Sequence, residues 1–181
     1  REQKNIVDRK INFLPKILKK NDLLVVNNSK VIFSHLVGFI NSRQVSVNLF
    51  KKEGTHIWRA FSKPSKRFKL KTIIYFGEYL SAEVIKKNDG GEVLLKFIFK
   101  GDFSKILNKY GKVPLPPYIK KEITNHKEEM LNYQTVFAKV SGSFASPTAG
   151  LHFSERLINN LKNKGINFAE VTLHVGAGTF L

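Results

Sequence analysis

Cysteine is absent from this chain of 181 residues, and its absence removes several classes of site. Without thiols there is no disulfide framework and no Cys-based zinc or redox centre, which fits a reducing compartment. Apolar runs are short, and none approaches the roughly 20 residues that a membrane-spanning helix needs. The five histidines, at positions 35, 56, 126, 152 and 174, lack metal-ligand spacing. We therefore expect a cytoplasmic protein with no metal and no membrane association.

Acidic residues are also scarce, because 14 Asp and Glu stand against 31 Lys and Arg and leave a net charge of +17. Such an excess attracts polyanions and most simply indicates nucleic acid, RNA or DNA. An A/T-rich genome also favours Lys, Asn and Ile codons, so a basic surface without a nucleic-acid partner stays open. Hydrophobic residues make up 42% of the chain, which is ample for a packed core.

The middle of the chain consists of short β-rich runs separated by polar turns. Asp89-Gly90-Gly91 is a good hairpin turn, because glycine accepts positive φ. Six strands at regular spacing favour a closed antiparallel β-barrel, which leaves no exposed edges. The runs are VIFSHLVGF, QVSVNLF, HIWRAFS, TIIYFG, LSAEVI and EVLLKFIFK.

The flanking segments predict an α/β domain. Residues 11–20 have the spacing of a short helix, and LLVVN, at 23–27, is typical of a strand covered on both faces. Asp102 is a plausible N-cap of a helix that Gly111 ends at its C′ position. We therefore predict a discontinuous α/β domain over residues 1–33 and 101–181, incomplete at its C-terminus, with an inserted β-barrel over residues 34–100.

Two glycine-bearing turns predict a small-molecule site. In PTAGLHFSERL, at 147–157, Ser154 caps a helix whose N-terminus favours anions, with Glu155 in its first turn. In HVGAGTF, at 174–180, glycines that follow a strand let the backbone approach a ligand at the edge where α/β proteins bind ligands. Each turn carries a histidine, His152 and His174. The alternative is that Gly150 only makes a turn and that each histidine has a structural role.

Two further segments allow two interpretations each. KPSKRFKLK, at 63–71, is basic with one interleaved Phe and resembles an RNA-backbone contact, or it is a solvated hairpin tip. Lys63, Lys66, Arg67 and Lys69 are its candidate RNA-binding residues. VPLPPY, at 113–118, is either a rigid linker or a wall that presents Tyr118 to a flat ring.

Together these motifs resemble a known family. DLLVVNNSKVI, GKVPLPPYI, YQTVFAK, PTAGLHFSERL and VTLHVGAGTF are similar, in this order, to motifs of the S-adenosylmethionine:tRNA ribosyltransferase-isomerases of queuosine biosynthesis. The resemblance covers nearly the whole chain, which is truncated at both ends relative to the family. It implies an α/β domain with an inserted β-barrel, and it implies tRNA and S-adenosylmethionine as substrates, without a metal. The ribosyl group would be transferred to 7-aminomethyl-7-deazaguanine at the wobble position and rearranged to epoxyqueuosine.

The resemblance and the two turns together give the candidate residues. We expect His152 and His174 to act as acid and base, with Glu155 as a weaker third, because a histidine near neutral pKa suits proton transfer. We expect a monomer; a non-enzymatic basic RNA-binding module and a small-molecule-binding domain are the alternatives, and whether the truncated chain is active stays open. The candidate substrate-binding residues are Asn27, Asn28, Lys30, Tyr118, Pro147, Thr148, Ala149, Gly150, Gly176, Gly178 and Thr179.

Overall fold

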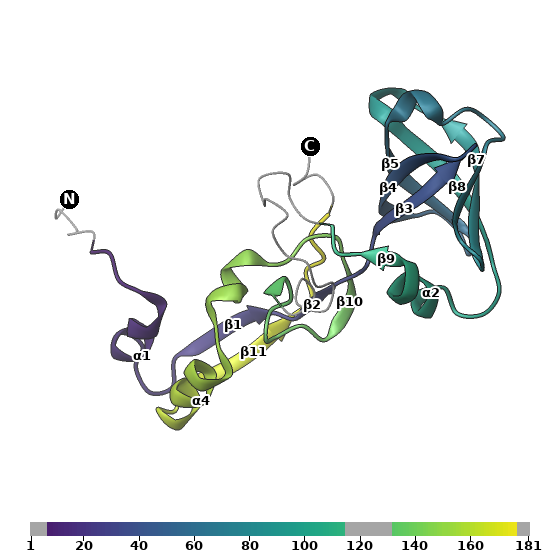
Figure 1. Ribbon diagram of the computed structural model, residues 1–181. Coiled ribbons are helices and arrows are strands. Elements are labelled where there is room, and N and C mark those ends of the chain that lie inside the picture. The colour runs from purple at the N-terminus through teal and green to yellow at the C-terminus, as the bar shows by residue number, and fades with distance from the viewer. Residues whose placement is uncertain (1–6, 115–131, 177–181) are drawn as a thin grey trace.

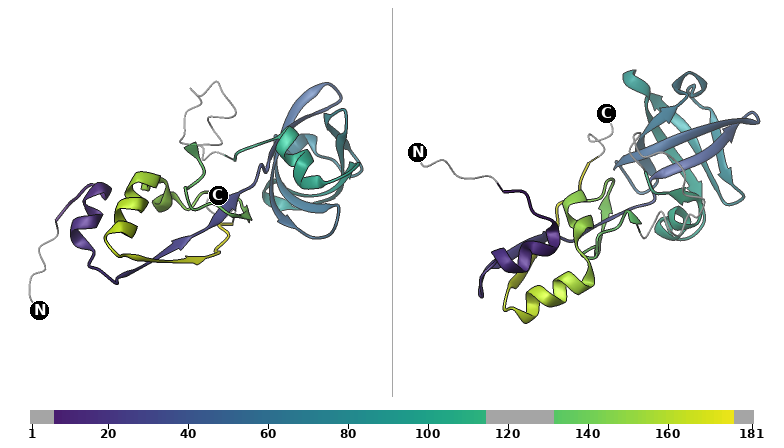
Figure 2. Two further views of the ribbon diagram at one scale, coloured as in Figure 1. Left: turned by 90° about the horizontal axis from the view of Figure 1, so that it is seen from below. Right: turned by 60° about the vertical axis from the view of Figure 1, so that its left-hand side comes forward.

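The computed structural model describes residues 7–114 and 132–176. The molecule is elongated, with an antiparallel barrel at one end and an α/β part at the other (Figures 1 and 2). Among the described residues, no helix is both long and apolar enough to cross a membrane. The helical elements are η1 (Ile11–Phe13), α1 (Leu14–Ile17), η2 (Ser65–Arg67), η3 (Asp89–Gly91), α2 (Phe103–Tyr110), η4 (Thr148–His152) and α4 (Glu155–Asn163).

The barrel confirms the predicted fold class. Its strands are ordered β4-β5-β8-β7-β6-β3, all antiparallel, and the pairing of β3 with β4 closes the sheet. Inward positions alternate with outward ones, so Val45, Val47 and Leu49 of β4 are buried while the residues between them are not. The strands are β3 (His35–Ile40), β4 (Arg43–Lys52), β5 (Ile57–Lys63), β6 (Ile73–Gly77), β7 (Leu80–Lys87) and β8 (Glu92–Phe99), and β9 (Gly111–Lys112) adds to β3.

Both ends of the barrel are closed by aromatic side chains. Phe68 is fully buried in the barrel core, so the Phe interleaved in the basic segment is not available at the surface. At the other end α2 packs Phe103 against Trp58 and Phe97. The Asp102 carboxylate accepts hydrogen bonds from the backbone N–H groups of residues 104 and 105, which confirms the predicted N-cap. The helix ends at Gly111 as predicted, although Gly111 has an extended backbone, because it also begins β9.

The α/β part contains two parallel strand pairs. β1 (Leu23–Asn27) pairs with β11 (Asn167–Val171), and β2 (Ser29–Val31) pairs with β10 (Val140–Ser143). One apolar cluster contains Leu14 of α1, Leu18 directly after it, and Leu157 and Leu161 of α4. It packs on Leu24 and Phe168 of the β1–β11 pair.

The prediction that β1 is covered on both faces is wrong. Leu23 and Val25, on the face away from the helices, are 61% and 55% exposed. An apolar run indicates that its side chains favour burial, but it does not identify an element that covers each face. The division into residues 1–33, 34–100 and 101–181 stays a prediction; in the structure α2 packs on the barrel core.

Candidate functional site

The turn that carries His174 leaves β11 and crosses to β10. The Asn27 side chain holds its start: Nδ2 donates to the Leu173 carbonyl at 2.8 Å, and the Leu173 N–H donates to Oδ1 at 3.1 Å. The Val175 N–H then donates to Ser143 Oγ at 3.0 Å, and the Val175 carbonyl accepts from the Phe144 N–H at 2.9 Å. Residues 173 and 175, on either side of His174, are therefore held at the ends of β1 and β10.

Gly142 leaves the space in which the His174 ring lies. A Cβ at residue 142 would lie 2.8 Å from both Cε1 and Nε2 of that ring, and the backbone has a φ of +148°. Glycine is the residue that satisfies both conditions at low cost. The imidazole of His174 therefore lies directly on the backbone of β10, and its side chain remains exposed.

The turn that carries His152 forms η4 and leads into α4. A Cβ at Gly150 would lie 2.8 Å from Cγ2 of Thr135, so η4 packs closely on the YQTVF segment. Ser154 Oγ accepts from the Leu157 N–H at 3.2 Å, which confirms the predicted N-cap of α4. Thr148, Ala149 and His152 are exposed on this turn.

The YQTVF segment is fixed to β2 by one side chain. Gln134 Nε2 donates to the Val31 carbonyl at 2.8 Å, and its Oε1 accepts from the Val31 N–H at 3.0 Å. The side-chain amide thus satisfies both backbone groups of a buried strand residue, as a neighbouring strand would. This contact positions the YQTVF segment, on which η4 packs.

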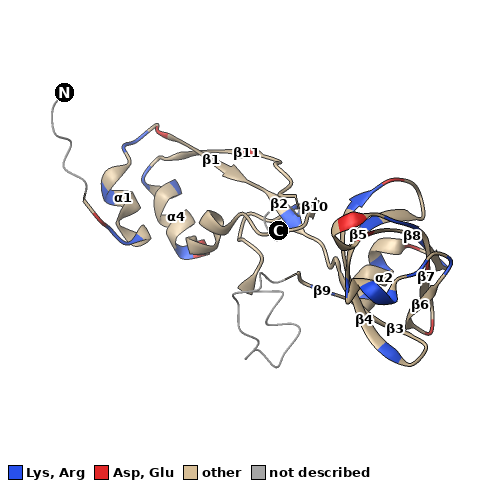
Figure 3. Ribbon diagram, turned by 90° about the horizontal axis from the view of Figure 1, so that it is seen from above, with Lys and Arg blue, Asp and Glu red and all other residues tan. Residues whose placement is uncertain are grey.

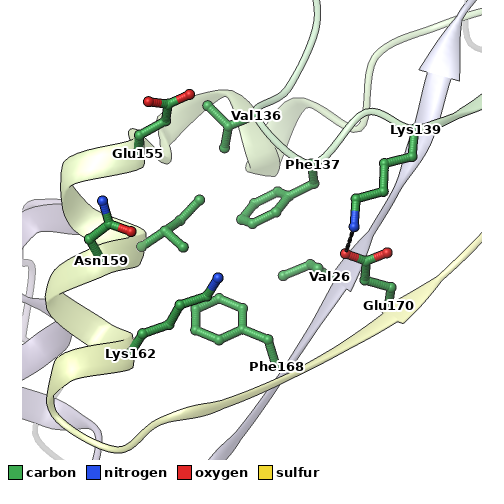
Figure 4. Close-up of a pocket in the computed structure, with 10 residues that line it drawn as sticks. Val26, Val136, Phe137, Lys139, Glu155, Asn159, Lys162, Phe168 and Glu170 are labelled. Atoms are coloured by element: carbon green, nitrogen blue, oxygen red, sulfur yellow. Dashed lines mark hydrogen bonds and ion pairs between the residues drawn. The ribbon is translucent and has the colours of Figure 1, made fainter.

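A pocket of about 300 Å³ lies between α4, the β1–β11 pair and residues 136–139 (Figure 4). Its apolar lining comes from Val26, Val136, Phe137, Ile158 and Phe168, and its polar lining from Lys139, Glu155, Asn159, Lys162 and Glu170. The volume is at the lower end of the range for small-molecule sites, whose walls are mostly apolar with a few placed polar groups. Among the described residues, neither His152 nor His174 lines it.

A chain of polar contacts joins this pocket to Asn28. Glu170 pairs with Lys139 at 2.5 Å and accepts from Asn28 Nδ2 at 3.1 Å, while Thr172 Oγ1 donates to Asn28 Oδ1 at 2.7 Å. The Lys139 ammonium, and after it the Asn28 amide, hold the pKa of Glu170 below its ordinary value of 4.5. Both Nδ2 and Oδ1 of Asn28 therefore form hydrogen bonds within the protein, and these bonds join the end of β1 to β11.

The structure brings some of the predicted site residues together and leaves others apart. Asn27 and Asn28 contact the segment that carries His174, and Glu155 lines the pocket at its rim (Figure 4). Lys30 is exposed on β2 opposite Ser141 of β10. Pro147 precedes η4, and Gly176 is exposed beyond Val175. Tyr118, Gly178 and Thr179 lie outside the described residues. Within residues 7–114 and 132–176 there is no group of three or more His, Asp or Glu side chains that could hold a metal ion.

The candidate RNA-binding residues lie on the loop that carries Phe68 into the barrel. Lys63, Lys66, Arg67 and Lys69 are all exposed, and Arg67 Nη1 donates to the Gln44 carbonyl at 2.7 Å. Lysine and arginine also occur on α1, α2 and α4, so the positive charge extends over both ends of the molecule (Figure 3).

Sequence reasoning missed Gly142, Gln134 and Glu170. A signal existed for one of them: Glu170 follows Phe168 at a spacing of two on a strand, which puts a charge on the helix-covered face and indicates a polar partner there. The other two depend on contacts across 32 and 103 positions, and local pattern does not reveal such contacts.

Comparison with known proteins finds a family model, curated relatives and a solved structure that are similar to this chain. The model of a family described as "Queuosine biosynthesis protein" matches residues 1–181. An S-adenosylmethionine:tRNA ribosyltransferase-isomerase of Zymomonas mobilis is 43% identical over 93% of this chain and 49% of its own length, and one of Clostridioides difficile is 42% identical over 99% and 52%. An S-adenosylmethionine tRNA ribosyltransferase of Thermotoga maritima with a solved structure is 26% identical, with a TM-score of 0.37 over 91% of this chain and 44% of that one.

The chain spans about half the length of the curated relatives that it matches. The family match nevertheless extends over all of its residues and includes both glycine turns. The chain therefore belongs to the family of queuosine biosynthesis proteins.

Proposed function

We propose that this chain provides the donor-binding and tRNA-binding body of an S-adenosylmethionine:tRNA ribosyltransferase-isomerase. The observation that carries the proposal is the family match over residues 1–181, together with relatives of that name that are 42 to 44% identical. In this reaction the ribosyl group of S-adenosylmethionine moves to the aminomethyl nitrogen of 7-aminomethyl-7-deazaguanine at the tRNA wobble position. Adenine and methionine leave, and epoxyqueuosine remains in the tRNA. We expect the protein to act as a cytoplasmic monomer without a metal.

The donor's chemistry assigns roles to the exposed histidines. The sulfonium acidifies the adjacent ribosyl carbon, so a modest base suffices to remove a proton there. We assign this base to His174, whose ring lies against Gly142, and a second proton transfer to His152, with Glu155 as a weaker candidate. Further contacts to the donor would come from Asn27, Asn28, Lys30, Pro147, Thr148, Ala149, Gly150 and Gly176.

The pocket supports the donor assignment. An apolar floor with charges of both signs suits the methionine part of S-adenosylmethionine, which carries an ammonium group and a carboxylate on a short apolar chain. Glu155 belongs both to this pocket and to the helix that follows His152, so a donor seated there would extend toward the first glycine turn.

The test uses the 181-residue chain, S-adenosylmethionine and tRNA that carries 7-aminomethyl-7-deazaguanine. We expect equimolar release of adenine and methionine with formation of epoxyqueuosine, measured by mass spectrometry of digested tRNA. His174→Ala should reduce product formation by about 100-fold or more, as loss of a general acid or base does. His56→Ala is the matched control, because that histidine stacks on Phe99 in the barrel. Unchanged product formation in a folded His174→Ala variant would refute its catalytic role.

A second function stays open, namely a basic RNA-binding module without catalysis. It is favoured by the net charge of +17 and by the two histidines lying outside the pocket lining. Calorimetry with S-adenosylmethionine separates the two functions, because a module that only binds RNA gives no heat of donor binding. Loss of tRNA affinity at high salt would not separate them, since electrostatic binding is common to both.

A further inference from the structure

Exposed apolar side chains form a row across the outer surface of the barrel. Phe39 of β3 stands opposite Tyr75 of β6, Tyr75 opposite Ser81 of β7, and Ser81 opposite Ile98 of β8. Residues that are paired in this way across a sheet lie side by side on one face. Phe39, Tyr75 and Ile98 are 51%, 60% and 53% exposed, whereas most of the large apolar side chains of these strands point into the barrel.

Positive charge lies beside the aromatic end of this row. Phe39 stands opposite Gln44 of β4, and the Gln44 carbonyl accepts a hydrogen bond from Arg67. The basic loop at 63–71 is therefore attached next to Phe39, with Lys66 and Lys69 exposed on it. The acidic residue nearest in register, Glu83, stands opposite Lys96 of β8, which offsets its charge.

This combination matches the chemistry of unpaired RNA. Bases without partners stack on exposed aromatic rings of a sheet, while Lys and Arg contact the phosphates between them. A protein partner with a neutral apolar surface would use the row but would gain nothing from the basic loop. Charge complementarity therefore favours RNA as the occupant.

We propose that Phe39 and Tyr75, extended by Ile98, form a stacking platform for unpaired bases of RNA, with the loop at 63–71 binding the adjoining phosphates. The proposal rests on the proposed function in one respect: the RNA is taken to be the tRNA substrate. It places the contact with the single-stranded part of that RNA on the barrel, apart from the two glycine turns.

The test compares binding of a short single-stranded RNA with binding of a duplex of the same sequence, measured by fluorescence anisotropy. Phe39→Leu and Tyr75→Leu keep apolar bulk but remove the aromatic face, and exposure of both side chains should leave folding intact. We expect each variant to bind the single strand about 5- to 100-fold more weakly, with little change for the duplex. Tyr75→Phe should restore single-strand binding. Tyr79→Leu is the matched control, since Tyr79 is 56% exposed but lies outside the row.

Salt and self-association measurements complete the test. Lys66→Gln with Lys69→Gln should reduce the salt dependence of binding, whereas the two Leu variants should leave the slope unchanged. Equal losses on single strand and duplex, or no loss at all, would overturn the proposal. A changed sedimentation profile of the Leu variants with unchanged RNA binding would show that the row contacts protein, and would overturn it as well. Failure of ribosyl transfer with intact aromatic-dependent RNA binding would refute the proposed function and leave the platform standing.

Discussion

At Gly142 two requirements on a single residue coincide. Its φ of +148° is unfavourable for any residue with a Cβ, and the space that a Cβ would fill holds the ring of His174. Gly142→Ala should therefore reduce the free energy of unfolding by about 1–3 kcal/mol and displace the His174 ring. Urea unfolding checks the first effect, and the chemical shifts of the His174 imidazole check the second.

Gly101→Ala separates backbone strain from ring displacement. Gly101 has a φ of +93° with nothing within 4 Å of its Cβ position, so it should lose similar stability without moving His174. If Gly142→Ala leaves the His174 resonances in place, the ring does not pack against Gly142 as the structure shows it.

Glu170 gives the α/β part a dependence on pH. Because Lys139 and Asn28 lower the pKa of this carboxylate, its contribution to stability is fully present above the ordinary value of 4.5 and is lost as the pH falls through the lowered pKa. We therefore expect Glu170→Gln to flatten the loss of stability below about pH 4.5 in urea unfolding followed at several pH values. Glu155→Gln is the control, since the ion pairs of the described residues do not include that carboxylate. Parallel stability curves for Glu170→Gln and the parent would exclude this role of Glu170.

Among the elements, the loop at 63–71 places one of its side chains in the barrel core and others at the surface. Phe68 is fully buried and closes one end of the barrel, while Leu70 in the same loop is 60% exposed. Phe68→Ala should therefore cost about 3–5 kcal/mol of unfolding free energy, because it leaves a cavity in the core. Leu70→Ala should change stability by no more than about 0.5 kcal/mol. Thermal and urea unfolding of the two variants measure the difference. A loss of unfolding free energy for Phe68→Ala as small as that for Leu70→Ala would contradict the role of Phe68 in closing the barrel end.

The barrel could be predicted from sequence because each of its strands carries its own signal. Alternation places one face of each strand inside, and turns such as Asp89-Gly90-Gly91, with φ of +67° and +80° at its glycines, mark the strand ends. β1 carries no alternation of apolar and polar residues. Its continuous apolar run indicated two covered faces, so its exposed face was not predicted. The burial of Phe68 was not predicted either, since a basic segment gives no indication that its one aromatic residue turns inward.

For the candidate site, the sequence indicated the two turns but not what holds them. The glycines and histidines are local signals, whereas Gln134 on Val31 and Ser143 on Val175 are contacts between segments far apart in the chain. The pocket was not predicted either, because its walls come from four segments that meet only after folding. The roles of His152 and His174 stay predictions that the transfer assay tests.

At the scale of the whole molecule, the β1–β11 pair presents an apolar face to solvent. Leu23, Val25, Val171 and Leu173 are 61%, 55%, 38% and 64% exposed on the side away from α1 and α4. Parallel strands are normally covered on both faces, and a contiguous exposed apolar surface binds other apolar surfaces. Val25→Lys combined with Leu173→Lys should therefore lower the fluorescence of a bound apolar dye by about half or more while changing stability by less than about 0.5 kcal/mol. Leu70→Lys is the matched control, because it removes an equally exposed apolar side chain from the barrel. An equal decrease in the control would mean that the dye reports total apolar exposure, whereas a decrease confined to the double variant would locate the apolar binding surface on the uncovered face of β1 and β11.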